Sequence, residues 1–406
     1  MRRALIIFIV IIILAGIGVG TYFYFFAKTP SLSVIPTETS GLPVAGQETP
    51  SNSEESASTT IPSATTISAR LVKISAGPVV SGEVVINIPE TVVGSSTPTD
   101  AGGTVVKYIE RGSGNVFSYR TQTGVTTRTS NQTVPGIESA AWAPDGTAAL
   151  VRYLSGTDFS TINTYILPAD SGPTSTGFFL PQNLSDISVS STSTLLLTSG
   201  VNGSVVSVGN MHDARTAELF TTPLSALHIS FAGPSNYLVN TKPSSTLSGF
   251  AFIVDSKGHF SLVAGPKNGL TSLASPSGKF VLISYSIKDS LQMKLVDVST
   301  GNAMPLPVAT ITDKCVWAAD DSAIYCGVPL DLPDGYAYPD DWYQGAVHFS
   351  DRIWKIDVSG RYAQLVLDFS KETDSPLDAE ALALDAIETV LVFLNRNDGS
   401  LWSYKI

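Results

Sequence analysis

The sequence predicts an all-β fold: a β-propeller of seven four-stranded antiparallel blades, preceded by one transmembrane helix and a linker. Three observations lead to this prediction. The N-terminus is a long apolar segment, the residues after it are rich in Ser, Thr and Pro, and the remainder repeats with a period of roughly 42 to 47 residues, which is typical of propeller blades. Only 15% of the 406 residues are charged, and short runs of strand-forming residues prevail over helical periodicity.

The apolar segment is residues 4–26, "ALIIFIVIIILAGIGVGTYFYFF". At about 1.5 Å per residue, a helix of this length spans the roughly 30 Å hydrocarbon core of a bilayer. Arg2 and Arg3 precede it, so residues 1–3 are expected in the cytoplasm and the rest of the chain outside the membrane. A cleaved secretory signal is the alternative, and it would also export the remainder. We therefore expect a single-pass protein of a bacterial cell membrane whose folded part is extracytoplasmic.

Residues 27–69 are dominated by Ser, Thr and Pro. Such a composition buries too little apolar surface to offset the entropy of ordering the chain. We expect a disordered linker here.

Residues 70–406 contain the repeat. The stretch "ESAAWAPDGTAALVRYL" at Glu138 has counterparts in "LTSLASPSGKFVLISYS" at Leu270 and "DKCVWAADDSAIYCGV" at Asp313. Each reads as a hairpin of two strands. Alignment of six such units places the following residues in one column: Trp142, Val189, Phe231, Ala274, Trp317 and Leu384.

A second kind of hairpin recurs between those of the first kind, as in "GFAFIVDSKGHFSLVAG" and "RIWKIDVSGRYAQLVL". One inner and one outer hairpin make a four-stranded blade, and a further inner strand within Val79–Pro89 brings the number of blades to seven. The last unit is one strand short, whereas Ala69–Ser75 is a spare strand. We expect this strand to pair with the C-terminal blade and close the ring. An open β-sandwich is the alternative.

The segment Pro144-Asp145-Gly146 has two interpretations. Asp145 could be a catalytic carboxylate, or the three residues could be a turn between strands. Pro, Asp and Gly in this order are typical of a turn, and the other units keep the apolar column while losing the Asp. We interpret the segment as a turn.

The units "WAPDGTAALVRY" and "ASPSGKFVLISY" resemble the PD-type repeat of TolB-like propellers, which are relatives of WD-repeat propellers. The resemblance implies a propeller fold and a tendency to bind other molecules, but no particular chemistry. The unit "WAADDSAIY" departs from the pattern because it lacks both Pro and Gly.

The two cysteines, Cys315 and Cys326, lie at equal distances from the centre of one predicted hairpin turn. They should face each other across the two strands, where a disulfide is geometrically possible. Export makes oxidation plausible, and a pair of reduced buried thiols is the alternative.

The candidate binding site is an insertion in the sixth blade, residues 329–351. It holds the densest group of aromatic and polar residues in the chain: Tyr336, Tyr338, Asp340, Asp341, Trp342, Tyr343 and Gln344. Aromatic rings and carboxylates together suit recognition of a sugar face or a protein. In the alternative interpretation, these rings pack over the blade and plug the channel mouth.

The remaining composition argues against several functions. A net charge of -11 disfavours nucleic acid as a partner. The four histidines are scattered, and the sequence shows no nucleophile elbow, phosphate loop or calcium loop, so we expect no metal, no cofactor and no catalytic residue. The sequence favours a membrane-anchored binding or assembly module of the cell envelope, with an envelope protein or glycan as its partner. An envelope hydrolase or lyase with its site on the propeller face and a purely structural spacer are the alternatives.

Overall fold

The computed structural model describes residues 60–61, 65–66, 70–89, 102–130, 132–170, 176–191, 193–288 and 290–406. The predicted transmembrane helix, residues 4–26, and most of the predicted linker lie outside these ranges. Among the described residues, no helix is long and apolar enough to cross a membrane. Residues Ala57–Ile406 form one compact unit.

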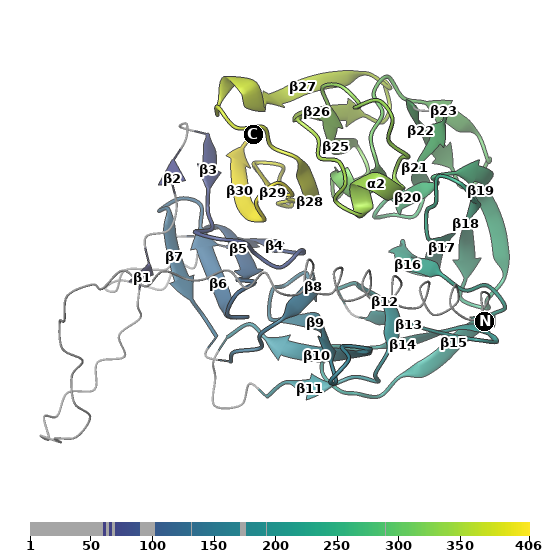
Figure 1. The fold of residues 1–406 in the computed structure, drawn as a ribbon, viewed down its shortest axis with the longest axis horizontal. Coiled ribbons are helices and arrows are strands. Elements are labelled where there is room, and N and C mark those ends of the chain that lie inside the picture. Colours follow the sequence, from purple (N-terminus) through teal and green to yellow (C-terminus); the bar gives the residue numbers. More distant parts are fainter. Residues whose placement is uncertain are drawn as a thin grey trace, which may run out of the picture. The chain divides into compact units, whose positions relative to one another are not determined.

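Seven antiparallel sheets follow one another around a central axis (Figure 1), which confirms the seven-bladed propeller and excludes the open sandwich. Blade 1 contains β4 (Val84–Ile88), β5 (Gly103–Ile109), β6 (Val116–Arg120) and β7 (Val125–Arg128), with β1 (Thr60–Ile61) added at its outer edge. Blade 2 contains β8 (Ile137–Trp142), β9 (Ala148–Ser155), β10 (Thr161–Pro168) and β11 (Phe178–Phe179). Blade 3 contains β12 (Leu184–Val189), β13 (Thr194–Gly200), β14 (Gly203–Gly209) and β15 (Ala217–Thr222).

The other blades repeat this order, with the first strand nearest the axis. Blade 4 contains β16 (Leu227–Ala232), β17 (Asn236–Thr241), β18 (Ser248–Asp255) and β19 (Phe260–Asn268). Blade 5 contains β20 (Thr271–Ala274), β21 (Phe280–Ile287), β22 (Ser290–Asp297) and β23 (Ala303–Pro305). Blade 6 contains β24 (Cys315–Trp317), β25 (Ala323–Pro329), β26 (Asp351–Asp357) and β27 (Ala363–Asp368), with the short helix α2 (Asp340–Tyr343) in its insertion and η1 (Thr312–Lys314) before it.

Blade 7 closes the ring as predicted. It contains β28 (Ala379–Leu384), β29 (Val390–Asn395) and β30 (Ser400–Lys405), and η2 (Phe369–Lys371) precedes it. Its fourth strand is β3 (Leu71–Lys73) from the other end of the chain, in register Leu71↔Tyr404, and β2 (Thr65–Thr66) pairs outside β3. The first and last strands of the propeller therefore belong to the same sheet.

The strand order gives the ring two distinct faces. We call the face that carries the connections between second and third strands, and between successive blades, the top face. The bottom face carries the turns between first and second strands and between third and fourth strands. The blade 6 insertion leaves β25 and enters β26, so it lies on the top face.

The hydrophobic core is divided among the interfaces between neighbouring blades. One cluster joins Val106 and Tyr108 of blade 1 to Val392 of blade 7, and another joins Leu238 of blade 4 to Ile283 of blade 5. Alternate residues of each strand face opposite neighbours, so every blade buries both of its faces.

The segment around Asp145 is a turn, as predicted. Gly146 has a φ of +67°, which glycine adopts without steric cost, and Asp145 accepts hydrogen bonds from the backbone and hydroxyl of Thr147 at 3.0 and 2.8 Å. Partial burial would raise the pKa of Asp145, but these hydrogen bonds lower it below its usual value. Asp145 is thus a turn residue that stays ionised.

Blades 6 and 7 lack the turn glycine, and the structure shows what replaces it. Asp321 and Glu388 occupy the equivalent positions with φ of +64° and +54°. The Asp321 carboxylate reaches back to blade 5, where it accepts a hydrogen bond from Ser275 at 2.9 Å and another from the Ser277 hydroxyl. Glu388 accepts hydrogen bonds from Tyr325 and Lys355 of blade 6. The two acidic residues that replace the turn glycine therefore join blade 6 to blade 5 and blade 7 to blade 6.

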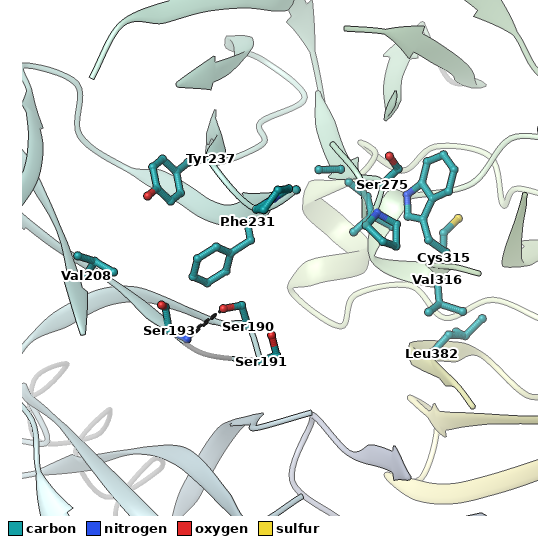
Figure 2. Close-up of a pocket in the computed structure, with 16 residues that line it drawn as sticks. Ser190, Ser191, Ser193, Val208, Phe231, Tyr237, Ser275, Cys315, Val316 and Leu382 are labelled. Carbon is teal, nitrogen blue, oxygen red and sulfur yellow. Dashed lines mark hydrogen bonds between the residues drawn. The ribbon is translucent and has the colours of Figure 1, made fainter. Parts of the chain in front are cut away.

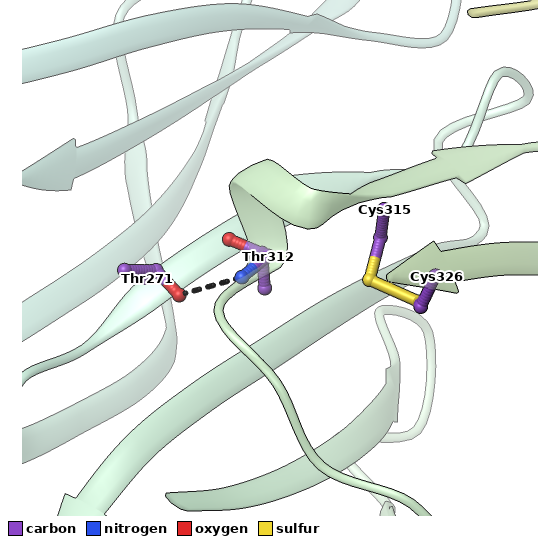
Figure 3. The surroundings of a disulfide bond; sticks show 4 residues. All are labelled: Thr271, Thr312, Cys315 and Cys326. Atoms are coloured by element: carbon purple, nitrogen blue, oxygen red, sulfur yellow. Dashed lines mark hydrogen bonds between the residues drawn. A yellow bond between two sulfur atoms is a disulfide. The ribbon is translucent and has the colours of Figure 1, made fainter. Parts of the chain in front are cut away.

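Cys315 and Cys326 form the predicted disulfide (Figure 3). They are direct partners in the register of β24 and β25, and both are buried. Beside them, the Thr312 backbone donates a hydrogen bond to the Thr271 hydroxyl at 3.2 Å, which ties blade 6 to blade 5. A disulfide is typical of an oxidising environment, so it supports an extracytoplasmic location for this domain.

Replacement of Asp321 by Gly tests the inter-blade role of this side chain. The change removes an acceptor from Ser275 and Ser277, while relief of the positive φ offsets part of that loss, so the free energy of unfolding should fall by about 1 to 2 kcal/mol. The control is Asp320→Ala next to it, because the exposed Asp320 carboxylate accepts its hydrogen bond from Ser322 in the same turn. Denaturant unfolding of both variants measures the difference, and an Asp321→Gly protein as stable as the parent would contradict this role.

Candidate functional site

The structure separates the predicted insertion residues into buried and exposed members. Trp342 is only 1% exposed and Tyr338 only 3% exposed. The Trp342 ring stacks on Phe349 with centroids 6.2 Å apart, and the Tyr338 hydroxyl donates to the Pro333 carbonyl at 2.7 Å. Burial raises the pKa of Tyr338 to about 12. These two rings fit the packing interpretation of the insertion.

The two adjacent carboxylates of the insertion hold it in place. Asp340 accepts hydrogen bonds from the Ser245 backbone and hydroxyl, both at 2.9 Å, and so attaches the insertion to the top face of blade 4. Asp341 accepts a hydrogen bond from the Ala337 backbone at 2.7 Å within the insertion itself. Neither carboxylate faces the other across a common space, which a glycosidase-like pair would require.

A buried ionic cluster lies beneath the insertion. The Lys314 ammonium group forms ion pairs with Asp351, at 2.8 Å, and with Asp378, and all three side chains are fully buried. Asp378 also accepts hydrogen bonds from the Trp342 indole at 3.0 Å and from the Phe349 backbone at 3.0 Å. Burial raises the pKa of Asp351 to about 6, although Lys314 opposes this shift. The cluster binds η1, β26, blade 7 and the insertion to one another.

Tyr336, Tyr343 and Gln344 are the exposed members of the predicted set. The Tyr343 hydroxyl donates to the Asp313 carboxylate, and its ring packs edge-on against Trp342 at 5.2 Å. Burial of the hydroxyl and the charge of Asp313 raise the pKa of Tyr343 well above its usual range. A partner-binding role of the insertion remains a prediction, and these three side chains are the ones that a partner could touch.

A cavity of about 710 Å³ opens on the bottom half of the central channel, away from the insertion (Figure 2). It is enclosed by the inner strands and bottom turns of blades 3 to 6 and reaches Leu382 of blade 7. Phe231 and Tyr237 of blade 4 lie on one side of it, with Ser190 and Ser193 below them in Figure 2. Inner strands from distant parts of the sequence thus build a single site.

The lining of this cavity combines three aromatic residues and four serines with nine aliphatic, glycine, proline or cysteine residues. The following residues surround it: Ser190, Ser191, Ser193, Val208, Phe231, Gly233, Pro234, Tyr237, Leu273, Ala274, Ser275, Pro276, Cys315, Val316, Trp317 and Leu382. None of them carries a charge. Trp317 is 7% exposed, and its indole N–H is buried without a hydrogen-bond acceptor among the described residues. Because this N–H has almost no accessible surface, it does not face the open space of the cavity.

A second, smaller cavity of about 340 Å³ occupies the top half of the channel. Leu273 lines both cavities, so they adjoin at this residue. The top half is polar: His228 Nδ1 lies 3.3 Å from an Asp186 carboxylate oxygen, and the Tyr343–Asp313 pair stands at its edge. The two halves therefore differ in chemistry.

Sequence reasoning found some of these residues but assigned them another role. Phe231, Ala274 and Trp317 belong to the aligned column, which we interpreted as a mark of the fold, and all three line the bottom cavity. Their common position in the repeat places them at the same level of the channel, which is the signal that could have identified the site. Lys314 and Asp378 carried no such signal, because nothing in the sequence shows that they meet. Among the described residues, no group of three or more His, Cys, Asp or Glu side chains is arranged to hold a metal ion.

No family model matches the sequence, and no curated protein matches it. The resemblance to TolB-like propellers therefore rests on the repeat units alone. Solved structures are similar in fold. An oligogalacturonate lyase from Vibrio parahaemolyticus matches with a TM-score of 0.55 and 9% identity, over 83% of this chain and 93% of that one. An oligogalacturonate lyase in complex with manganese matches with a TM-score of 0.54 and 9% identity, over 86% and 96%. At this identity the likeness shows a propeller fold and nothing about activity.

Replacement of Lys314 by Met tests the buried cluster. The change leaves two carboxylates buried without a cation, so the free energy of unfolding should fall by about 3 to 5 kcal/mol. Lys371→Met is the matched control, because the Lys371 side chain is 73% exposed and its loss should change stability by less than about 0.5 kcal/mol. Equal stability of the two variants in denaturant unfolding would show that the cluster has no such structural role.

The raised pKa of Asp351 predicts a pH dependence of stability. Its pKa is about 6 in the folded protein against a usual value of 3.8, so the folded state holds this proton more tightly than the unfolded state. The contribution of Asp351 to stability should therefore decrease as the pH rises from about 4 to 6. Asp351→Asn removes this titration. Denaturant unfolding of both proteins at several pH values measures the difference in their free energies of unfolding. As the pH rises from about 4 to 6, the parent should lose stability relative to Asp351→Asn. A difference that does not change with pH would contradict a raised pKa of Asp351.

Proposed function

We propose that this chain is an extracytoplasmic binding module whose bottom cavity binds a neutral carbohydrate. The observation that carries the proposal is the lining of that cavity, in which three aromatic rings and several serine hydroxyls enclose about 710 Å³ without a charged side chain. The disulfide and the predicted N-terminal anchor support a location outside the cytoplasm.

The proposed ligand class follows from the chemistry of the lining. A sugar ring presents C–H groups on its faces, which pack on aromatic side chains such as Phe231 and Tyr237, and hydroxyls at its edges. Serine hydroxyls of the lining, such as that of the exposed Ser191, can donate to or accept from those edges. An acidic sugar would require a cation, which the lining does not provide. A neutral glycan therefore fits better than a uronate.

Binding is favoured over catalysis at this cavity. Its lining contains no Asp, Glu, His, Lys or Arg, the residue types that most often transfer protons in catalysis. Serine alone is a weak nucleophile unless a neighbouring base activates it. The cavity can hold and orient a ligand, and its residues offer little means to transform it.

A glycan-binding experiment on the full chain in detergent tests this proposal. Binding to an array of neutral and acidic oligosaccharides should select neutral ones. Phe231→Ala should weaken the affinity about tenfold, equivalent to about 1.4 kcal/mol, because it removes a ring that packs on the sugar face. Titration calorimetry with the best glycan measures this change.

Tyr362→Ala is the control for these variants, because Tyr362 is an exposed aromatic residue on the bottom face outside the cavity. It should leave the affinity unchanged. Equal losses in the control and in Phe231→Ala would contradict a site in the cavity. Failure of all neutral glycans to bind would favour the spacer or protein-partner alternatives.

A different observation favours catalysis as a second candidate function. In the top cavity, Asp186 orients His228, and Tyr343 is paired with Asp313, so two candidate proton-transfer groups line one space. Turnover of envelope glycans or peptides that is lost in His228→Gln and Tyr343→Phe, but kept in Phe231→Ala, would support an enzyme. Absence of turnover over a broad substrate panel would count against it.

A further inference from the structure

The top face exposes a large apolar side chain at the same place in five consecutive blades. The place is the connection between the second and third strands, or the residue directly beside it. The side chains are Phe159 in blade 2, Val201 in blade 3, Leu247 in blade 4, Ile287 in blade 5 and Leu330 in blade 6. Their exposed fractions run from 38% for Leu330 to 103% for Val201.

Single exposed apolar residues are common on protein surfaces and need no explanation. Here, however, one structural position repeats the feature from blade to blade, although the connections differ in length and sequence. The corresponding connections of blades 1 and 7, residues 110–115 and 396–399, read "ERGSGN" and "RNDG" and are polar. The apolar tips thus form an arc over blades 2 to 6 and stop at the blades that close the ring.

Further features of the top face extend this arc. Leu154 and Leu224 are exposed on the top face beside the tips of blades 2 and 3. The exposed Lys242 and Lys288 flank the tips of blades 4 and 5, whereas the exposed Asp158 and Asp331 lie beside Phe159 and Leu330. Apolar tips with lysines beside them, as in blades 4 and 5, are typical of surfaces that enter the interfacial region of a bilayer, where the ammonium groups meet lipid phosphates.

The chain outside the described residues identifies the occupant of this surface. Residues 4–26 are predicted to cross a membrane, and residues 27–59 belong to the predicted linker, residues 27–69. A flexible linker of that length has an end-to-end distance of roughly 30 Å. The propeller would then remain within reach of the bilayer, and the high effective concentration would make even a weak apolar contact persistent.

We propose that the top face of the propeller lies on the lipid bilayer, with the apolar tips of blades 2 to 5 inserted into its interface and Leu330 at the base of the blade 6 insertion beside them. The bottom cavity then faces away from the membrane and stays open to ligands. This inference depends on the predicted anchor and on the top-face side chains, and it holds whether or not the bottom cavity binds a carbohydrate.

Depth-dependent fluorescence quenching of the full chain in phosphatidylcholine proteoliposomes tests the proposal. Val201→Cys, Leu247→Cys and Ile387→Cys each provide one accessible thiol for an environment-sensitive dye, because the native cysteines form a buried disulfide. Ile387 is the control, since it is 67% exposed on the bottom face. Dyes at Val201 and Leu247 should emit at shorter wavelength and be quenched by spin-labelled lipids, whereas the dye at Ile387 should not.

A second set of variants separates insertion from proximity. Phe159→Ser combined with Ile287→Ser should reduce the quenching of the dye at Val201, whereas Tyr362→Ser on the bottom face should leave it unchanged. Equal quenching at Val201 and Ile387, or none at Val201 and Leu247, would overturn the proposal. A shift of the Val201 dye to shorter emission wavelength in native membranes, but not in vesicles of pure lipid, would also overturn the proposal and indicate a protein partner.

Discussion

Pairing of β3 with β30 is the interaction on which the rest of the structure depends. Each blade buries its two faces against its neighbours, so a ring with one gap would expose an apolar face on both sides of that gap. Three pairs of residues close it, from Leu71↔Tyr404 to Lys73↔Trp402. Two charged side chains add to the closure: Arg70 lies over the Tyr404 ring, and Lys73 pairs with Asp398 at 3.0 Å. Closure also defines the channel, because the inner strands enclose a cavity only when all the blades are in place.

The fold was largely predictable because the repeat encodes it locally. A turn residue, an apolar column and a strand recur in one short window, and the ring follows from repetition. The disulfide was predictable for the same reason, since Cys315 and Cys326 lie in one hairpin and the turn sets their register. The residues of the bottom cavity and of the buried ionic cluster could not be grouped from the sequence. The bottom cavity combines residues from five blades, and the pairing of Lys314 with Asp378 joins positions 64 residues apart. Contacts of this kind depend on how the blades pack against one another, and no local sequence pattern predicts them.

The units that depart most from the repeat connect neighbouring blades. Asp321 and Glu388 accept a positive φ that glycine would adopt at lower cost, and each uses its carboxylate to bind the preceding blade. In blades 4 and 5, Gly233 and Gly278 keep the turn glycine and allow the two turns to approach closely. A Cβ at either position would lie 2.3 Å from a backbone oxygen of the other turn, so those two turns pack directly on each other. In blades 4 to 7, turns of the bottom face are therefore joined to a neighbouring blade either by close backbone contact or by an acidic side chain.

The insertion in blade 6 gives the channel its asymmetry. On the top face, Asp340 attaches it to blade 4, Asp378 binds its indole from below, and Arg396 of blade 7 donates to the carbonyls of Trp342 and Tyr343. Hydrogen bonds to blades 4 and 7 hold this segment in place, and its Tyr343 lines the top cavity. The bottom mouth has no such cover from this insertion, and there the aligned column presents Phe231 and Trp317 to the channel. Trp342 and Tyr338, conspicuous in the sequence, thus pack at one end of the channel, and residues of the ordinary repeat line the cavity at the other.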